Sequence, residues 1–313
     1  MEKSLEQSII KTLSYFDIFS APLTAGELYK YLWNPEKTFS YSYFFEQLHS
    51  LDSSSVIQSQ GGYFFLRGRS KIIAQRERRI WYMEKKMKRA QKAAGLLRFI
   101  PFVKAVFVCN QIQIGVTEKS DIDVLVVVQS GRLYMARFFI TAILSVFRLR
   151  RNRKKIADRI CLSFYVTVDA LNFSRFKIAE DDVYLPYWLA TLMPVYDHMG
   201  IAEKITEQNQ WVSDLLPHAF EEKYSPNFFQ IQNEKFSLLV KNIFENFFSG
   251  RIGNVLERMT KKFQHKHMSE TKSGEKGEHS HVVISDSVLK FHENDRREKF
   301  RSEWQERYHS LGL

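Results

Sequence analysis

The chain has 313 residues, of which 44% are hydrophobic and 14% aromatic, so it can build two or three domains with apolar cores and is not disordered as a whole. Its net charge of +11 favours acidic partners such as nucleic acid, nucleotides or anionic lipid surfaces. Both cysteines, Cys109 and Cys161, stand in apolar stretches, which favours the reduced thiols of a cytoplasmic protein over a disulfide framework. The first residues show no apolar signal segment, so no targeting sequence is expected.

The first 70 residues predict a small module of three helices and a β-hairpin. Pro22 separates the first two helices, and Thr24 can cap the second. The helical periodicity and a glycine pair between two apolar runs place these elements at about 9–19, 25–32, 41–51 and 56–66. This order of elements resembles the winged-helix fold, which often binds DNA through its third helix. The third helix here carries no Lys or Arg, so DNA binding, protein contact and a structural role all stay open.

Residues 71–94 predict an amphipathic connector helix with a basic face. Such a face is most often simply solvated. The functional alternative places its basic side chains near a polyanion, and the candidates are Arg78, Arg79, Lys85 and Lys88.

The segment 95–180 carries the pattern most typical of chemistry. Two apolar strands are predicted at 105–109 and 121–128, joined by a loop. Because successive side chains alternate across a strand, Asp121 and Asp123 share one face. Two carboxylates this close repel each other unless a cation neutralises them, and Mg²⁺ prefers such oxygen ligands. A solvated turn at the start of the strand is the alternative interpretation.

This arrangement of a strand, a short loop, Ser-Asp-Ile-Asp at 120–123 and an aliphatic strand resembles the nucleotidyltransferase superfamily, whose catalytic domains are like that of polymerase β. The resemblance covers about residues 95–170 and implies an α/β fold (α+β) with a small mixed sheet. It implies that Asp121 and Asp123 are catalytic and bind Mg²⁺, and that Ser120 helps to fix the loop. The substrate implied is a nucleoside triphosphate.

The chain departs from the family pattern at two places. Where the family carries a Gly-Ser pair that holds the triphosphate, this chain offers the bulkier Asn110 or Gln111, whose amides can donate to phosphate oxygens. The family's third carboxylate is missing from the strand expected at 160–166, where Ser163 stands instead. Two substitutes flank that strand, Asp158 and Asp169.

A helix predicted over about 132–149 is apolar nearly all round and meets a basic segment at its end. The apolar run is shorter than the roughly 20 residues that a membrane span requires, and it contains Arg137. We therefore expect a helix packed on the sheet and no membrane span, with peripheral membrane contact as the alternative.

Residues 181–313 predict a helical C-terminal region with a flexible polar loop at about 264–280. Pro194 is expected to end a helix, and Gly250 can break a long helix over about 236–263. A strand or a cap can follow at 282–286. In families like polymerase β such a region frequently forms the wall that holds the acceptor or the base. An oligomerisation surface is the alternative, and the oligomeric state stays open.

Together these patterns predict a winged-helix-like module, a nucleotidyltransferase-like core and a helical region. The leading hypothesis is Mg²⁺-dependent transfer of a nucleotide from a nucleoside triphosphate to an unknown acceptor. The alternative is a catalytically impaired nucleotidyltransferase fold that acts as a DNA-binding or regulatory protein, because the Gly-Ser pair and the third carboxylate are missing. The basic surface makes nucleic acid a candidate partner in either case.

Overall fold

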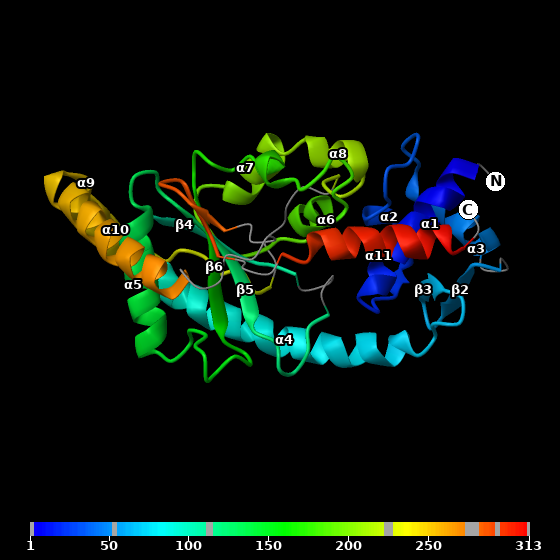
Figure 1. Cartoon of the computed structure of the whole chain (residues 1–313), viewed down its shortest axis with the longest axis horizontal. Helices are drawn as coiled ribbons and strands as arrows, with labels where there is room; N and C mark the ends of the chain where they lie inside the picture. Colours follow the sequence, from blue (N-terminus) through cyan, green and yellow to red (C-terminus); the bar gives the residue numbers. More distant parts are fainter. Residues whose placement is uncertain are drawn as a thin grey trace.

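Two open β-sheets organise this mixed α/β protein (Figure 1). The computed structural model describes residues 3–51, 55–110, 115–221, 228–272, 282–291 and 295–311; the side chains of 3–4 and 267–272 are not described. A three-stranded sheet belongs to the N-terminal module, and a six-stranded sheet forms the centre of the molecule. Across the described parts of the chain, no helix combines the length and the apolar character that crossing a membrane requires.

The N-terminal module contains the three helices and the hairpin expected from the sequence, with one short additional strand. Its elements are α1 (Lys3–Ile18), β1 (Leu23–Thr24), α2 (Ala25–Lys30), α3 (Tyr41–Leu51), β2 (Ile57–Gln60) and β3 (Tyr63–Leu66). The strand order is β1-β3-β2, and both pairings are antiparallel. Thr24 caps α2 as predicted: its hydroxyl accepts from the Glu27 amide, and the Glu27 carboxylate accepts from the Thr24 amide.

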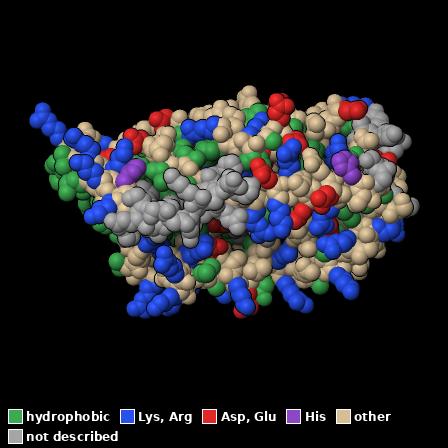
Figure 2. Space-filling model, viewed as in Figure 1, with side chains coloured by type: hydrophobic (Ala, Val, Ile, Leu, Met, Phe, Trp, Pro, Cys, Tyr) green, Lys and Arg blue, Asp and Glu red, His purple; other side chains and the backbone are tan. Residues whose placement is uncertain are grey.

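Helix α4 (Ile72–Leu97) is the basic connector, and it is three residues longer than predicted at its C-terminal end. Met87, Ala90, Ala94 and Leu97 recur at intervals of three or four residues and are buried. This spacing lays the second half of the helix against the central sheet. Figure 2 shows Lys and Arg side chains along the lower edge of the molecule, where α4 lies in Figure 1.

The central sheet has the strand order β7-β4-β5-β6-β9-β8. Its strands are β4 (Val103–Val108), β5 (Ile122–Val128), β6 (Ile160–Thr167), β7 (Met193–Asp197), β8 (Val283–Ile284) and β9 (Val288–Lys290). Strands β4 and β5 pair antiparallel, whereas β5 and β6 pair parallel and are joined through helix α5 (Leu133–Val146). A parallel pair requires such a crossover, and the apolar helix packs on the sheet as the sequence predicts.

Both faces of the central sheet are covered, which explains the nearly continuous apolar run of β5. Ile122, Val124 and Val126 belong to a core shared with α4 and α5. Leu125 and Val127 belong to a second core, which includes residues of α6 (Tyr184–Ala190), α7 (Ile201–Gln208), α8 (Trp211–Leu215) and α11 (Arg297–His309).

The expectation of a helical region after residue 181 is wrong in part, because β7 and β9 were not expected and belong to the central sheet. Pro194 lies within β7 instead of ending a helix. The sheet accommodates this proline because β7 is an edge strand, where one missing N–H donor costs little. The predicted strand at 282–286 is present in part as β8.

Two long helices follow α8 in the chain, α9 (Lys235–Ser249) and α10 (Arg251–Lys272). They are separated at Gly250 as predicted. A Cβ atom on Gly253 would come within 1.7 Å of the Phe248 carbonyl oxygen, so the tight turn between the helices requires glycine there. The predicted loop at 264–280 is wrong for its first part, because α10 continues to Lys272. Residues 273–281 lie outside the described residues.

The C-terminal helix α11 packs beside α1, so that the two ends of the chain lie together (Figure 1). The Trp304 indole donates to the Lys11 carbonyl oxygen at 2.9 Å, and the rings of Tyr15 and Tyr187 stack with centroids 4.3 Å apart. The N-terminal module therefore shares one core with the helices beside the central sheet.

Candidate functional site

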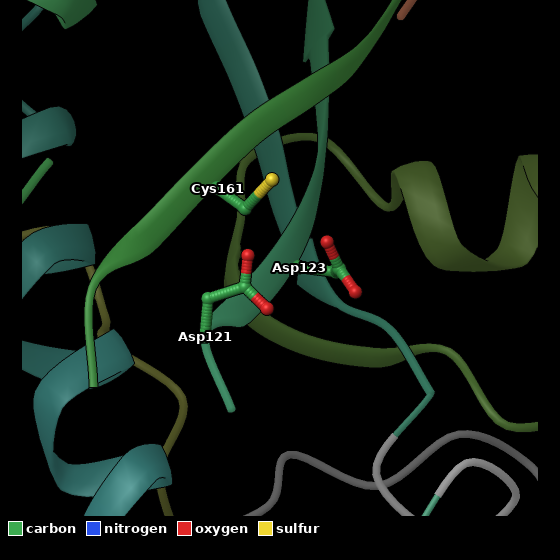
Figure 3. Close-up of side chains that lie close together, drawn as sticks. All are labelled: Asp121, Asp123 and Cys161. Carbon is green, nitrogen blue, oxygen red and sulfur yellow. The ribbon is translucent and has the colours of Figure 1, made fainter. Parts of the chain in front are cut away.

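Three polar side chains converge where β5 and β6 begin. Asp121 directly precedes β5, and Asp123 is the second residue of that strand. Cys161 lies on β6 in register with Asp123. One ligand atom from each lies within 4.8 Å of the other two. Figure 3 shows the three side chains pointing toward one another from the two neighbouring strands. We call this group the Asp-Asp-Cys cluster.

Strand alternation produces the first half of this cluster, as the sequence predicts. Asp121 and Asp123 project to the face of β5 that also carries Leu125 and Val127, while Ile122 is buried on the opposite face. The parallel pairing of β5 with β6 supplies the second half. A register shift follows directly after the Asp123–Cys161 pair, and regular pairing resumes from Leu125–Phe164 to Val128–Thr167.

The loop before β5 is fixed from inside by a buried lysine. Lys86 on α4 is only 1% exposed, and its ammonium donates to the Ser120 carbonyl oxygen at 2.6 Å and to Asp158 at 2.7 Å. The Ser120 hydroxyl donates to the Thr117 carbonyl oxygen at 3.1 Å and accepts from the Thr117 amide. Ser120 therefore holds the turn that delivers Asp121.

The cluster is only partly neutralised. Arg151 donates to Asp121 at 2.6 Å and to the Cys161 sulfur at 3.6 Å. Burial, and then the nearby Asp121 charge, raise the pKa of Asp123 to about 6, although hydrogen bonds from Cys161 and Asn110 and the Arg151 charge oppose the rise. Burial and the two carboxylates raise the pKa of the Cys161 thiol to about 12. At neutral pH the cluster therefore contains two carboxylates and a protonated thiol.

Asn110, at the end of the strand before the loop, lies beside Asp123. Its backbone has a φ of 63°, a left-handed conformation that asparagine tolerates better than most residues. Its side-chain oxygen accepts from the Tyr184 hydroxyl at 2.9 Å, and its hydrogen bond to Asp123 lowers the pKa of that carboxyl. The structure thus brings Asn110 to the cluster, whereas Gln111 lies outside the described residues.

A pocket of about 180 Å³ opens beside Asp123 and Asn110. Its further lining combines aromatic rings, three cations and a second acid: Phe164, Phe176, Tyr184, Trp188, Phe300, Lys290, Arg296, Arg297 and Asp295. Asp295 accepts from Arg297 at 2.6 Å and from Lys290 at 3.3 Å, which holds both cations in place. Aromatic rings beside fixed cations are suited to a flat, negatively charged ligand.

Neither predicted substitute for the third carboxylate joins the cluster. Asp158 pairs with Lys85 at 2.8 Å and Lys86 at 2.7 Å, and these hydrogen bonds outweigh burial and lower its pKa. Asp169 follows the opposite end of β6, where the Thr167 hydroxyl hydrogen-bonds to it and lowers its pKa. Among the described residues, Cys161 is instead the third side chain with a metal-ligating atom at the cluster.

Cys161, Arg151 and Tyr184 are therefore the site residues that the sequence interpretation missed. Cys161 reaches Asp123 through the parallel register of β5 and β6, in which Ile122 pairs with Ile160, and no pattern within either strand predicts that register. Arg151 reaches Asp121 across 30 residues, and no local pattern predicts that contact.

The donor set fits a divalent cation in part. Two carboxylates suit Mg²⁺, which takes oxygen ligands, and the cation would replace the Arg151 guanidinium at Asp121. A protonated thiol adds no ligand for Mg²⁺, whereas a thiolate would suit a softer ion. No family model, curated protein or solved structure matches this chain. The fold and the site therefore define its class: a mixed α/β protein with an acidic cluster at the start of a central strand, beside an aromatic and cationic pocket.

Proposed function

We propose that this protein is a Mg²⁺-dependent nucleotidyltransferase that transfers a nucleotide from a nucleoside triphosphate to an acceptor. The observation that carries the proposal is the convergence of Asp121 and Asp123 at the start of β5, next to a pocket suited to a flat anion. A strand, a loop and the Asp-x-Asp strand follow one another along the chain, which is the order on which the resemblance to nucleotidyltransferases rests, and this order supports the proposal.

The residues then have separate roles. Asp121 and Asp123 hold the metal, which would neutralise charge on the triphosphate and on the leaving pyrophosphate. Asp123 must be ionised for this role, which requires a pH above about 6. Asn110 or Gln111 would contact the triphosphate, and Ser120 keeps the loop in place through its turn with Thr117. Arg151, which pairs with Asp121 at 2.6 Å, would have to release that carboxylate for it to hold a metal.

A second candidate function is a non-catalytic regulator with the same fold. Two observations favour it: a thiol stands where a third ligand is needed, and Arg151 already neutralises Asp121. The N-terminal module, read as a winged helix from its element order and its β1-β3-β2 sheet, would then supply DNA binding.

Calorimetry with ATP, GTP, CTP and UTP, with and without Mg²⁺, together with a pyrophosphate-release assay, separates the two functions. The transferase predicts metal-dependent binding and pyrophosphate release that Asp121→Asn abolishes. Asp169→Asn is the matched control, because Asp169 lies at the other end of β6. Metal-independent binding or no binding, combined with salt-sensitive affinity for duplex DNA, would instead identify the regulator.

A further inference from the structure

A strongly cationic pocket of about 280 Å³ lies between the end of α5 and the start of β6. Seven residues line it: Ser145, Arg148, Arg150, Arg151, Asn152, Lys155 and Arg159. Five of these side chains carry a positive charge and none is acidic. Arg148, Arg150 and Lys155 are exposed, and Arg151, which is also exposed, is paired with Asp121 at 2.6 Å. Such a concave group of like charges attracts a ligand that carries several negative charges.

This cationic pocket adjoins the Asp-Asp-Cys cluster. Arg151 belongs to both, because it lines the pocket and donates to Asp121 at 2.6 Å. A ligand bound in the pocket would therefore lie within reach of a group that reacts at the cluster. The aromatic pocket next to Asp123 has a different lining and is available to another molecule.

The positive surface continues from the cationic pocket onto α4. Arg89 donates to the Asp158 carbonyl oxygen at 3.3 Å and Lys85 pairs with its carboxylate, so the basic face of α4 borders the segment that lines the pocket. The row of Lys and Arg side chains in Figure 2 follows this edge. Helix α4 carries two acids: Glu84, which is held by Lys88 at 2.6 Å, and Glu77, which is exposed.

Two aromatic rings stand out of this positive surface. Trp81 on α4 is 64% exposed, and Phe147, directly before Arg148, is 52% exposed. Exposed rings between cations suit the binding of single-stranded nucleic acid. Its phosphates can pair with the cations, and its unstacked bases can stack on the rings. Paired bases in a duplex would not present their faces to these rings.

We propose that the cationic pocket and the basic face of α4 bind single-stranded nucleic acid, and that this strand is the acceptor of the transferred nucleotide. The acceptor role rests on the proposed nucleotidyltransferase function, whereas binding of the strand does not. Exposed basic side chains continue beyond the cationic pocket on α4, at Arg78, Lys85, Lys88 and Lys92, with Lys85 paired to Asp158 and Lys88 to Glu84. Charges spread in this way suit an extended chain of phosphates better than one compact triphosphate.

Fluorescence anisotropy with labelled 12-nucleotide single-stranded RNA and DNA tests binding without Mg²⁺, so that no metal chemistry is involved. Arg148→Gln combined with Lys155→Gln removes two exposed charges from the pocket. We expect this variant to bind on the order of tenfold more weakly at low salt, with a salt slope smaller by about 1.4. The control is Arg258→Gln combined with Lys262→Gln, two exposed charges on α10, which should bind like the unaltered chain. Trp81→Ala should weaken binding at least about fivefold without changing the salt slope.

Several outcomes would overturn the proposal: no binding, equal weakening in the α10 control, or preference for duplex over single strand. Binding of inorganic tripolyphosphate without binding of either oligonucleotide would also overturn it. The test is independent of the transferase, because Asp123→Asn should keep full affinity for the oligonucleotide. If the strand binds as predicted and no nucleotide is incorporated at its end, the binding surface stands and only the acceptor role fails.

Discussion

Replacing Asp123 by asparagine should stabilise the folded protein at neutral pH. The ionised carboxylate is buried beside Asp121, and these two causes raise its pKa from the usual 3.8 to about 6. At about 1.4 kcal/mol per pKa unit, this rise in the pKa of Asp123 means that the ionised carboxylate lowers the free energy of unfolding by about 3 kcal/mol. Asparagine has nearly the same shape and an oxygen that can accept the same hydrogen bonds, so Asp123→Asn removes the charge and leaves the packing unchanged.

Because the pKa of Asp123 is raised in the folded chain, the gain in stability from Asp123→Asn depends on pH. Between about pH 4 and pH 6 the folded chain keeps a proton on Asp123 that the unfolded chain has lost, so stability falls as the pH rises through this window. Urea unfolding, followed by tryptophan fluorescence, should give a gain for Asp123→Asn of about 3 kcal/mol at pH 8 and roughly half of that at pH 5.

Asp169→Asn is the control for the titration. Asp169 is exposed and its pKa is lowered, so it is ionised in both the folded and the unfolded chain from pH 5 to pH 8. Its substitution should therefore have the same effect at both pH values. The reasoning on Asp123 is refuted if Asp123→Asn destabilises the protein, or if its gain does not change between pH 5 and pH 8.

Three further substitutions test the surroundings of the cluster. Arg151→Gln should raise the affinity for Mg²⁺ severalfold in calorimetry, because a guanidinium no longer competes for Asp121; weaker binding would contradict this. Cys161→Asp should tighten Mg²⁺ binding about tenfold by adding a third carboxylate, whereas Cys161→Ser should give no such gain. Lys86→Met should lower the free energy of unfolding by about 3 kcal/mol, because it leaves the Ser120 carbonyl and part of the Asp158 charge unpaired; the exposed Lys88→Met serves as its control.

The sequence predicts the local elements of this fold well, because their causes are local. The capping of α2 by Thr24, the hairpin of β2 and β3 and the break at Gly250 each depend on residues only a few positions apart. The alternation along β5 likewise brings Asp121 and Asp123 together without knowledge of any other strand.

The sequence fails where distant segments meet. Strand β7 contains Pro194 in an otherwise helical stretch, and only its position at the sheet edge makes the strand possible. The partner of Asp123 depends on the register between β5 and β6, which turned out to bring Cys161 and not Ser163 or Asp158 to the site. No periodicity within one strand contains that information.

The electrostatic state of the cluster argues for a ligand and against a purely structural role. A partly buried pair of carboxylates destabilises the fold unless each charge is compensated, and Arg151 hydrogen-bonds only to Asp121 of the two. Burial is the first cause of the raised pKa of Asp123 and the Asp121 charge is the second, and the Arg151 charge offsets them only in part. A divalent cation between the two carboxylates would compensate both charges and would free Arg151 to join the other cations of the neighbouring pocket. Binding of the cation would then lower the free-energy cost of the ionised Asp123, and the released Arg151 would strengthen the attraction for an incoming phosphate chain. The metal and the polyanion would thus be coupled without any movement of the sheet.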